Sequence, residues 1–353
     1  MPIDLKCDNA ECGKRMRLKD EAAGKKVKCS GCGRVLTVPA VQNEDGPVDL
    51  ALRLMGHESE SARRHGQPVY NAKLEDPACL QVLFDTPPNW RTADLMRPLR
   101  EYDPTMSRAT FEVGHAGDDN QAAYGLAAWG KHVVRFLAFD APIPATVLEC
   151  CVDPAHYKQA MKQRARASRA HALLYYGGYE KDVLENYVAL AAVAGALAGF
   201  DASVVTNESG HSSLPAGVLV PGQTDGDQME LLRSLPLLHL YCGFVKYEVK
   251  GVDGVWMRSY GADKFGLPDL AFLADGHQQG EDTFEIFSNI LGYLRESGAE
   301  LAAGHTMQVG PDMFVRLRER EKGEYFLESE GDLFVLERID ESDTNVAKRK
   351  KRH

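Results

Sequence analysis

Two segments of similar pattern organise the first 40 residues: Cys7-Asp8-Asn9-Ala10-Glu11-Cys12-Gly13-Lys14 and Cys29-Ser30-Gly31-Cys32-Gly33-Arg34. Each segment carries two cysteines, and glycine and a basic residue follow the second cysteine of each. Glycine accepts the positive φ of a tight turn, which can aim backbone N–H groups at thiolates. Two short turns with four cysteines supply a tetrahedral ligand set, so we predict one zinc ion bound by Cys7, Cys12, Cys29 and Cys32.

The predicted zinc is structural, because cysteine occupies all four positions and leaves no open position for a substrate. A metal-free core would have to be built from Leu5, Met16, Leu18, Val27, Val35, Leu36 and Val38. These side chains are too few for about 40 residues to fold unaided, so metal binding should supply most of the folding free energy. Unligated thiols or a redox pair are the alternative interpretation.

The second cysteine pair and the segment before it resemble a known bacterial module. Ala23-Gly24-Lys25-Lys26-Val27-Lys28, followed by Cys29-Ser30-Gly31-Cys32-Gly33, is similar to the short zinc ribbons at the start of many planctomycete-type bacterial proteins. The first pair departs from that pattern, because four residues separate its cysteines where the ribbons usually have two. The departure concerns the geometry of the first turn and leaves the number of ligands unchanged.

The charge of the chain is unevenly distributed. The 353 residues are 44% hydrophobic and 26% charged, which excludes wholesale disorder and a collagen-like structure. The net charge of -10 combines +4 in residues 1–40, -19 in residues 41–347 and +5 in residues 348–353. Attraction to an acidic surface must therefore come from the basic ends or from a local basic patch, unless the ends fold back onto the acidic body at low salt.

Cysteine usage and hydropathy predict a cytoplasmic protein without a membrane segment. The start of the chain lacks the basic region and apolar core of a secretory signal. The most lipophilic stretch, 187–200, is shorter than the roughly 20 residues that span a bilayer, so we predict a buried helix there. The four remaining cysteines, Cys79, Cys150, Cys151 and Cys242, are expected to be buried thiols in a reducing compartment.

Turn signals and apolar periodicity predict five parts of the chain: a zinc ribbon at 1–40, a linker with a short helix at 41–66, a first α+β unit at 67–227, a second α+β unit at 228–340 and a disordered basic tail at 341–353. The predicted helices cover 92–102 with Thr92 as cap, 144–168 with a break near Asp153-Pro154, 182–199 and 283–297. The predicted strands cover 79–84, 109–113, 132–139, 172–176, 202–206, 237–250, 255–260, 270–273, 313–318, 325–327 and 333–336. Helices against largely antiparallel strands favour an α+β fold with a two-layer α/β sandwich, for which tandem ferredoxin-like units are one arrangement.

Three motifs in the C-terminal half resemble a bacterial family. They are Met257-Arg258-Ser259-Tyr260-Gly261, Phe265-Gly266-Leu267-Pro268-Asp269 and Gly304-His305-Thr306, together with the helix at 283–297. Through them residues 236–310 resemble domain-of-unknown-function family 4261. That family has no established activity, so the resemblance implies a fold and no catalytic residues.

The chain carries no P-loop, dinucleotide-binding glycine pattern, nucleophile elbow or metalloprotease histidine pair. Three loop residues are weak candidates for a site, namely His211 beside two serines, and Asp275 and His277 near Glu281. Sequence adjacency supplies neither a positioned base nor an oxyanion hole, so polar loops are the favoured interpretation. Asp282 is expected to cap the helix that follows.

A basic stripe is the strongest remaining feature of the acidic body. Lys158, Lys162, Arg166 and Arg169 fall within an arc of about 80° on a predicted helix at 156–169. The stripe could dock an acidic partner or a phosphate backbone. A solvated face balanced by neighbouring carboxylates is the favoured interpretation.

We therefore predict a zinc-binding protein that binds or regulates an unidentified protein partner, without catalysis. The first alternative is a nucleic-acid-associated protein that uses the ribbon, the helix at 156–169 and the basic tail. It is not favoured, because residues 1–40 contain no aromatic side chain on which bases could stack. The second alternative is an enzyme whose site lies in loops 207–227 and 275–282, which must then converge on one pocket.

Overall fold

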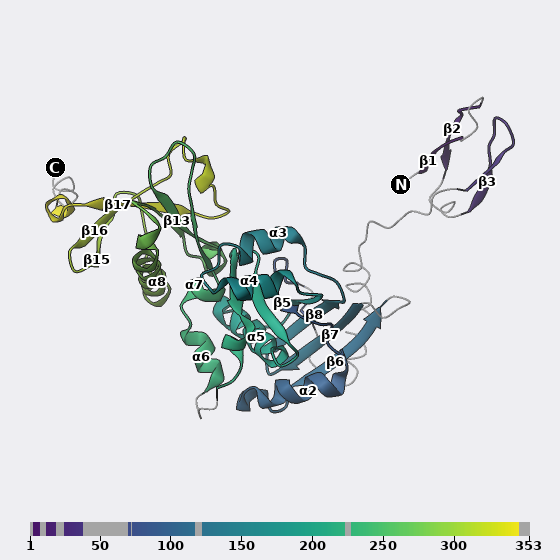
Figure 1. Ribbon diagram of the computed structural model, residues 1–353, viewed down its shortest axis with the longest axis horizontal. Coiled ribbons are helices and arrows are strands. Elements are labelled where there is room, and N and C mark those ends of the chain that lie inside the picture. The colour runs from purple at the N-terminus through teal and green to yellow at the C-terminus, as the bar shows by residue number, and fades with distance from the viewer. Residues whose placement is uncertain are drawn as a thin grey trace. The chain divides into compact units, whose positions relative to one another are not determined.

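The computed structural model describes residues 3–7, 12–18, 25–37, 70–71, 73–116, 122–222 and 227–345. The chain divides into two compact units, Met1–Gly56 and His57–His353 (Figure 1). The predicted linker helix at 41–66 and the basic tail from 346 onward lie outside the described residues, whereas Glu341–Asn345 form a short 3₁₀ helix.

The described residues of the first unit form two small antiparallel hairpins. Strand β1 (Ile3–Lys6) pairs with β2 (Arg15–Leu18), and β3 (Lys26–Lys28) pairs with β4 (Val35–Thr37). The buried cluster of this unit contains Cys7, Cys29 and Leu36, with little apolar packing around it. Such a small cluster agrees with the expectation that these residues need a metal ion to fold.

A seven-stranded sheet begins the second unit, with strand order β11-β10-β5-β9-β8-β7-β6 and every neighbouring pair antiparallel. Its strands are β5 (Cys79–Phe84), β6 (Thr110–Ala116), β7 (Ala122–Trp129), β8 (His132–Phe139), β9 (Ala170–Tyr176), β10 (Ala202–Asn207) and β11 (Ser212–Pro215). The five strands predicted in this part of the chain are present. Strands β7 and β11 were not predicted.

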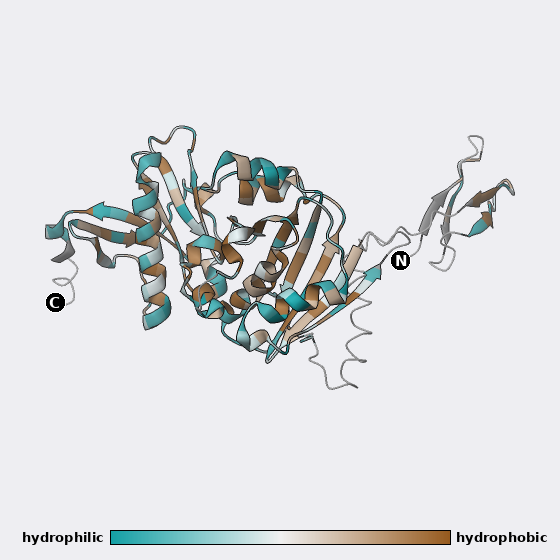
Figure 2. Ribbon diagram, turned by 60° about the horizontal axis from the view of Figure 1, so that its bottom comes forward, coloured by the Kyte–Doolittle hydropathy of each residue, from teal (hydrophilic) through white to brown (hydrophobic). Residues whose placement is uncertain are grey.

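Helix α5 (Val183–Leu197) covers one face of this sheet and confirms the predicted buried helix. Alternate side chains of β5, Leu80, Val82 and Phe84, join its core, as do residues of α2 (Thr92–Glu101). Figure 2 shows hydrophobic residues on both the strands and the covering helix. The residue before α2 is Arg91, with an extended backbone, so Thr92 is the first helical residue and not the cap.

A second layer packs on the opposite face of the same sheet. It comprises α3 (Ala145–Val147), a π-helix (Leu148–Val152) and α4 (Gln159–Arg166). Cys151 and Ala165 from this layer pack against Leu83 of β5. The predicted break in the 144–168 helix is confirmed, because Pro154 has no N–H with which to continue the helical hydrogen bonds.

A six-stranded sheet follows, with strand order β12-β13-β14-β17-β16-β15. All neighbouring pairs are antiparallel except β14 and β17, which are parallel. Helix α8 (Gly280–Ser297) packs on this sheet through Phe287, Leu291 and Leu294. The strands are β12 (Gly243–Tyr247), β13 (Val255–Tyr260), β14 (Asp269–Ala274), β15 (Thr306–Gly310), β16 (Met313–Arg318) and β17 (Leu333–Ile339).

Two segments predicted as strands are helical. Leu237–Leu240, the first part of the strand predicted at 237–250, form α7, which begins directly after Pro236. Tyr325–Leu327 form a 3₁₀ helix that buries Leu327. The remaining helices are α6 (Gln228–Ser234) and the 3₁₀ helices Pro104–Met106, Ala216–Leu219, Ala262–Phe265 and His277–Gln279.

The two sheets differ in strand order and in their pairing, so the structure does not confirm two tandem ferredoxin-like units. They share one buried cluster and meet where β12 passes the loop before β11. A Cβ atom on Gly243 would lie 1.6 Å from the carbonyl oxygen of Gly210, so glycine is required at that crossing. No helix of the described residues is long and apolar enough to cross a membrane.

Candidate metal centre and other candidate sites

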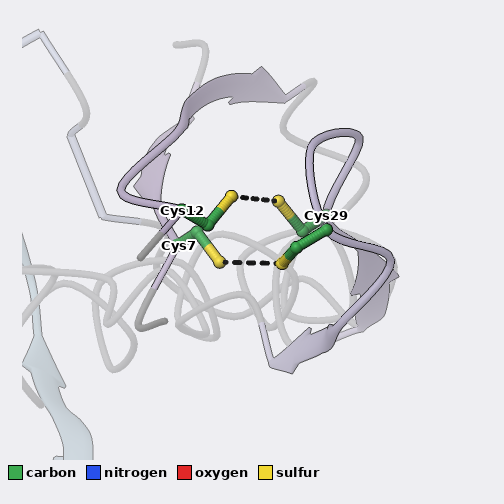
Figure 3. A group of neighbouring side chains, drawn as sticks. Cys7, Cys12 and Cys29 are labelled. Carbon is green, nitrogen blue, oxygen red and sulfur yellow. Dashed lines mark hydrogen bonds between the residues drawn. The ribbon is translucent and has the colours of Figure 1, made fainter. Parts of the chain in front are cut away.

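The four predicted ligands lie together in the first unit. One sulfur atom from each of Cys7, Cys12, Cys29 and Cys32 lies within 4.8 Å of the others. The Sγ atoms of Cys7 and Cys32 are 3.6 Å apart, and those of Cys12 and Cys29 are 3.7 Å apart (Figure 3). Within the described residues, this is the only group of three or more metal-binding side chains with such spacing.

Two equivalent turns hold the cysteines. The N–H of Cys7 donates to the carbonyl of Lys14, and the N–H of Cys29 donates to the carbonyl of Arg34. Gly13 and Gly33, which follow the second cysteine of each pair, have φ of +52° and +74°, as the sequence predicts. The longer spacing of the first pair therefore does not prevent its two sulfur atoms from joining the group.

Backbone donors favour a thiolate at this site. The N–H groups of Cys32 and Gly31 lower the pKa of the Cys29 thiol to about 6. The nitrogen of Gly31 lies 3.3 Å from the sulfur of Cys29. A Cβ atom on Gly31 would lie 2.9 Å from the sulfur of Cys12, so glycine at this position leaves room for a cysteine of the first hairpin. Cys29 can thus present deprotonated sulfur, the form that binds metal.

The basic stripe is only partly helical and is largely engaged by carboxylates and carbonyls. Helix α4 ends at Arg166, so the prediction that Arg169 lies on the same helix is wrong. Arg166 pairs with the carboxylate of Asp153, and Lys162 donates to the carbonyl of Asp153 at 2.6 Å. Arg169 donates to the carbonyl of Asp85, whereas Lys158 precedes α4 and is exposed. These contacts favour the interpretation of a balanced surface.

The loop candidates do not come together at one pocket. His277 is exposed and bonds to Glu248 at 3.1 Å, and the N–H of Asp275 donates to the side chain of Gln279. His211 lines two cavities, and no residue of 275–282 lines either of them. Asp282 lies in the first turn of α8 and is not its cap, because the helix begins earlier, at Gly280.

The adjacent cysteines behave as the sequence predicts. Both Cys150 and Cys151 are free thiols, and their sulfur atoms are 3.4 Å apart within the π-helix. Burial raises the pKa of both thiols, which makes them poor nucleophiles. The protonated form is therefore favoured, and a redox role has no support from their environment.

A cavity of about 290 Å³, which we call the junction cavity, was not predicted from the sequence. It lies between the two sheets, near the crossing of Gly210 and Gly243. The lining residues are Cys151, Pro154, Ala155, His156, Tyr157, His211, Ser212, Ser213, Leu214, Pro215, Leu238, His239, Phe244 and Phe284. No local signal could have found it, since these residues come from separate segments of the chain.

His211 has an unusual environment at this cavity. Its φ of +49° lies in the left-handed region, which non-glycine residues seldom adopt. Its ring stacks on Tyr260 at 4.3 Å between centroids, and the Arg258 guanidinium lies 3.8 Å from the centroid of the same Tyr260 ring. Burial lowers the pKa of His211, and the positive charge of Arg258 lowers it further. The neutral imidazole is therefore favoured at neutral pH.

The free energy of unfolding is expected to decrease as the pH is lowered from about 7.5 to about 5.5. Burial lowers the pKa of His132, His171 and His211 below the usual value of 6.5. As the pH falls, the unfolded chain binds protons at these histidines before the folded chain does. Their contribution to the free energy of unfolding is therefore fully present above about pH 6.5 and is lost as the pH falls through the lowered pKa values. Urea unfolding at the two pH values measures the change, and equal stability at both would contradict it.

Comparisons with known proteins cover part of the chain. The family described as Domain of unknown function (DUF4261) matches residues 258–337. The match supports the resemblance expected for the C-terminal half and runs from β13 into β17. No curated protein and no solved structure matches the chain. The comparisons therefore support a domain in the second unit and assign no activity to it.

Proposed function

We propose that this protein binds one structural zinc ion through Cys7, Cys12, Cys29 and Cys32 and uses the zinc-folded unit to dock an acidic protein partner, without catalysis. The observation that carries the proposal is the group of four cysteine sulfurs within 4.8 Å. Thiolate sulfur is a preferred ligand of zinc, and a set of four thiolates makes a closed, structural site. The zinc would hold the two hairpins together.

The surface of the first unit supports an acidic partner. In residues 12–16 and 25–36 the basic side chains are all exposed and no acidic residue occurs; the basic residues are Lys14, Arg15, Lys25, Lys26, Lys28 and Arg34. Val35 is 54% exposed and adds an apolar contact. Complementary charge steers such a surface toward an acidic partner and is weakened by salt.

Charge reversal on β3 tests the docking proposal. Lys26 and Lys28 are both exposed and lie two residues apart, so they share one face of the strand. The double variant Lys26→Glu/Lys28→Glu is expected to lose, by at least tenfold, the proteins that co-purify with the full chain. The matched control is Arg320→Glu/Lys322→Glu, which changes two exposed residues of the second unit by the same charge.

The zinc content of both variants should remain one per chain, which shows that the first unit is still folded. Unchanged co-purification in the β3 variant would refute docking through this surface. The same basic surface also favours a second candidate, binding to a phosphate backbone. If nucleic acid, and no protein, is released by the β3 variant, and binding weakens steeply between 50 and 200 mM salt, the partner is nucleic acid.

A further inference from the structure

The junction cavity is held open by hydrogen bonds between the first sheet and the end of helix α7. The buried Asn207 side chain donates to the carbonyls of Leu240 and Tyr241 at 3.0 and 2.9 Å, and its oxygen accepts from the N–H of Gly210. Ser212 donates to the carbonyl of Leu240 at 3.0 Å. These bonds fix the loop before β11 against the end of α7, so the cavity exists before any ligand arrives.

A second hydrogen-bonded chain fixes the opposite wall. Ser213 donates to the carbonyl of Cys151 at 2.6 Å, so its oxygen accepts from the hydroxyl of Tyr157 at 2.9 Å. The Cys151 carbonyl belongs to the π-helix, a rare form that is frequent at functional sites. The π-helix and the left-handed backbone of His211 are two uncommon conformations, and both lie at this cavity.

The lining of the cavity specifies the chemistry of an occupant. None of its lining residues is Asp, Glu, Lys or Arg. Phe244 and Phe284 form an aromatic wall, with centroids 5.6 Å apart and planes at 86°. Three imidazoles complete the lining, those of His156, His211 and His239, and none has a hydrogen-bond partner among the described residues. The cavity thus offers aromatic contacts and unused ring nitrogens without a charged group.

We propose that the junction cavity binds a small, uncharged heteroaromatic molecule of one or two rings. Ring faces and edges would pack on Phe244 and Phe284, and in-plane nitrogen groups would bond to the free imidazole nitrogens. The volume of about 290 Å³ lies at the lower end of ligand pockets, which limits the occupant to this size. The three histidines are not grouped closely enough to form a metal site by themselves.

This inference is independent of the zinc unit and its partner, so the two proposals can fail separately. The test uses benzimidazole, which is uncharged at about pH 7.5 and carries one donor and one acceptor in the ring plane. Indene has the same shape and lacks both nitrogens. Titration of the full chain, followed by calorimetry and by NMR of the histidine ring protons, is expected to show one benzimidazole per chain and at least tenfold weaker binding of indene.

Two variants locate the site. His211→Asn removes the imidazole but keeps a residue that tolerates positive φ, and His239→Asn changes an exposed residue that lines the cavity. Each is expected to weaken benzimidazole binding at least tenfold. His277→Asn, an exposed histidine outside the cavity, is the matched control and should leave binding unchanged.

Three results would overturn the inference. One is the absence of benzimidazole binding up to its solubility limit. Another is binding that neither cavity variant weakens, which would place the molecule elsewhere. The third is a shift of the same histidine signals by Ni²⁺ without any benzimidazole binding, which would assign the cavity to a metal ion.

Discussion

Replacing Cys29 with serine is expected to unfold the first unit and to leave the second unit intact. Structural zinc contributes on the order of 10–16 kcal/mol of binding free energy in small zinc-dependent folds, and serine does not replace a thiolate ligand. The unit has little else to hold it, since its buried cluster contains only Cys7, Cys29 and Leu36 among the described residues. Metal analysis should fall from one zinc per chain toward zero.

Amide hydrogen exchange shows where the loss occurs. Protection in residues 12–18 and 25–37 should disappear in Cys29→Ser, while the thermal transition of the second unit stays unchanged. Ser30→Ala is the matched control, because Ser30 is the exposed neighbour of the ligand and has no place in the sulfur group. A purified protein without metal, whose first unit keeps its amide protection, would show that zinc is not needed.

The elements that could be predicted from the sequence are those whose periodicity is local. Side chains of strand β5 alternate between two buried layers, and α5 and α8 bury apolar side chains along their length. The local sequence pattern therefore predicts whether each of these elements is a strand or a helix. Strand β7 does not, because its alanines and Gly125 have low strand propensity. A Cβ atom on Gly125 would lie 2.0 Å from the carbonyl oxygen of Glu112, a constraint that only the paired strand imposes.

The same distinction applies to the candidate sites: a site formed within short segments can be predicted from the sequence, and a site formed by distant segments cannot. The four cysteines can be predicted as ligands because zinc coordination requires a short spacing between the two cysteines of each turn. The contact partners of the basic stripe cannot all be predicted from the sequence, since Arg169 donates at 3.2 Å to the carbonyl of Asp85, which lies 84 residues earlier. The junction cavity is hidden for the same reason, because His156, His239 and Phe284 become neighbours only when the two sheets pack together.

Replacing Arg258 with alanine is expected to destabilise the second unit by about 3–5 kcal/mol, the cost of leaving the partner of a buried ion pair alone. The Arg258 side chain is fully buried and donates to the carbonyls of Ser259 and Glu328. Its Nη2 lies 3.7 Å from the carboxylate of Asp269, which is 2% exposed. Without Arg258 this buried carboxylate would keep its hydrogen bonds from Ser259, Ala262 and Ser329 but would lose its ion-pair partner.

The pH dependence separates the lost charge from lost packing. Burial raises the pKa of Asp269 even beside Arg258, and removing Arg258 should raise it further. The folded variant then binds a proton more tightly than the unfolded chain, so the deficit caused by Arg258→Ala should shrink between about pH 7 and pH 5. Asp269→Asn added to Arg258→Ala should recover part of the loss at neutral pH, because it removes the unpaired charge.

Urea unfolding at both pH values measures these differences. Arg338→Ala makes the same change at an exposed position of β17 and should alter stability by no more than about 0.5 kcal/mol. A deficit in Arg258→Ala that is small, or that does not depend on pH, would mean that water reaches Asp269 in the variant. In that case Arg258 stabilises the second unit through its contacts with Tyr260 and the loop at 326–328, and its charge contributes little to the free energy of unfolding.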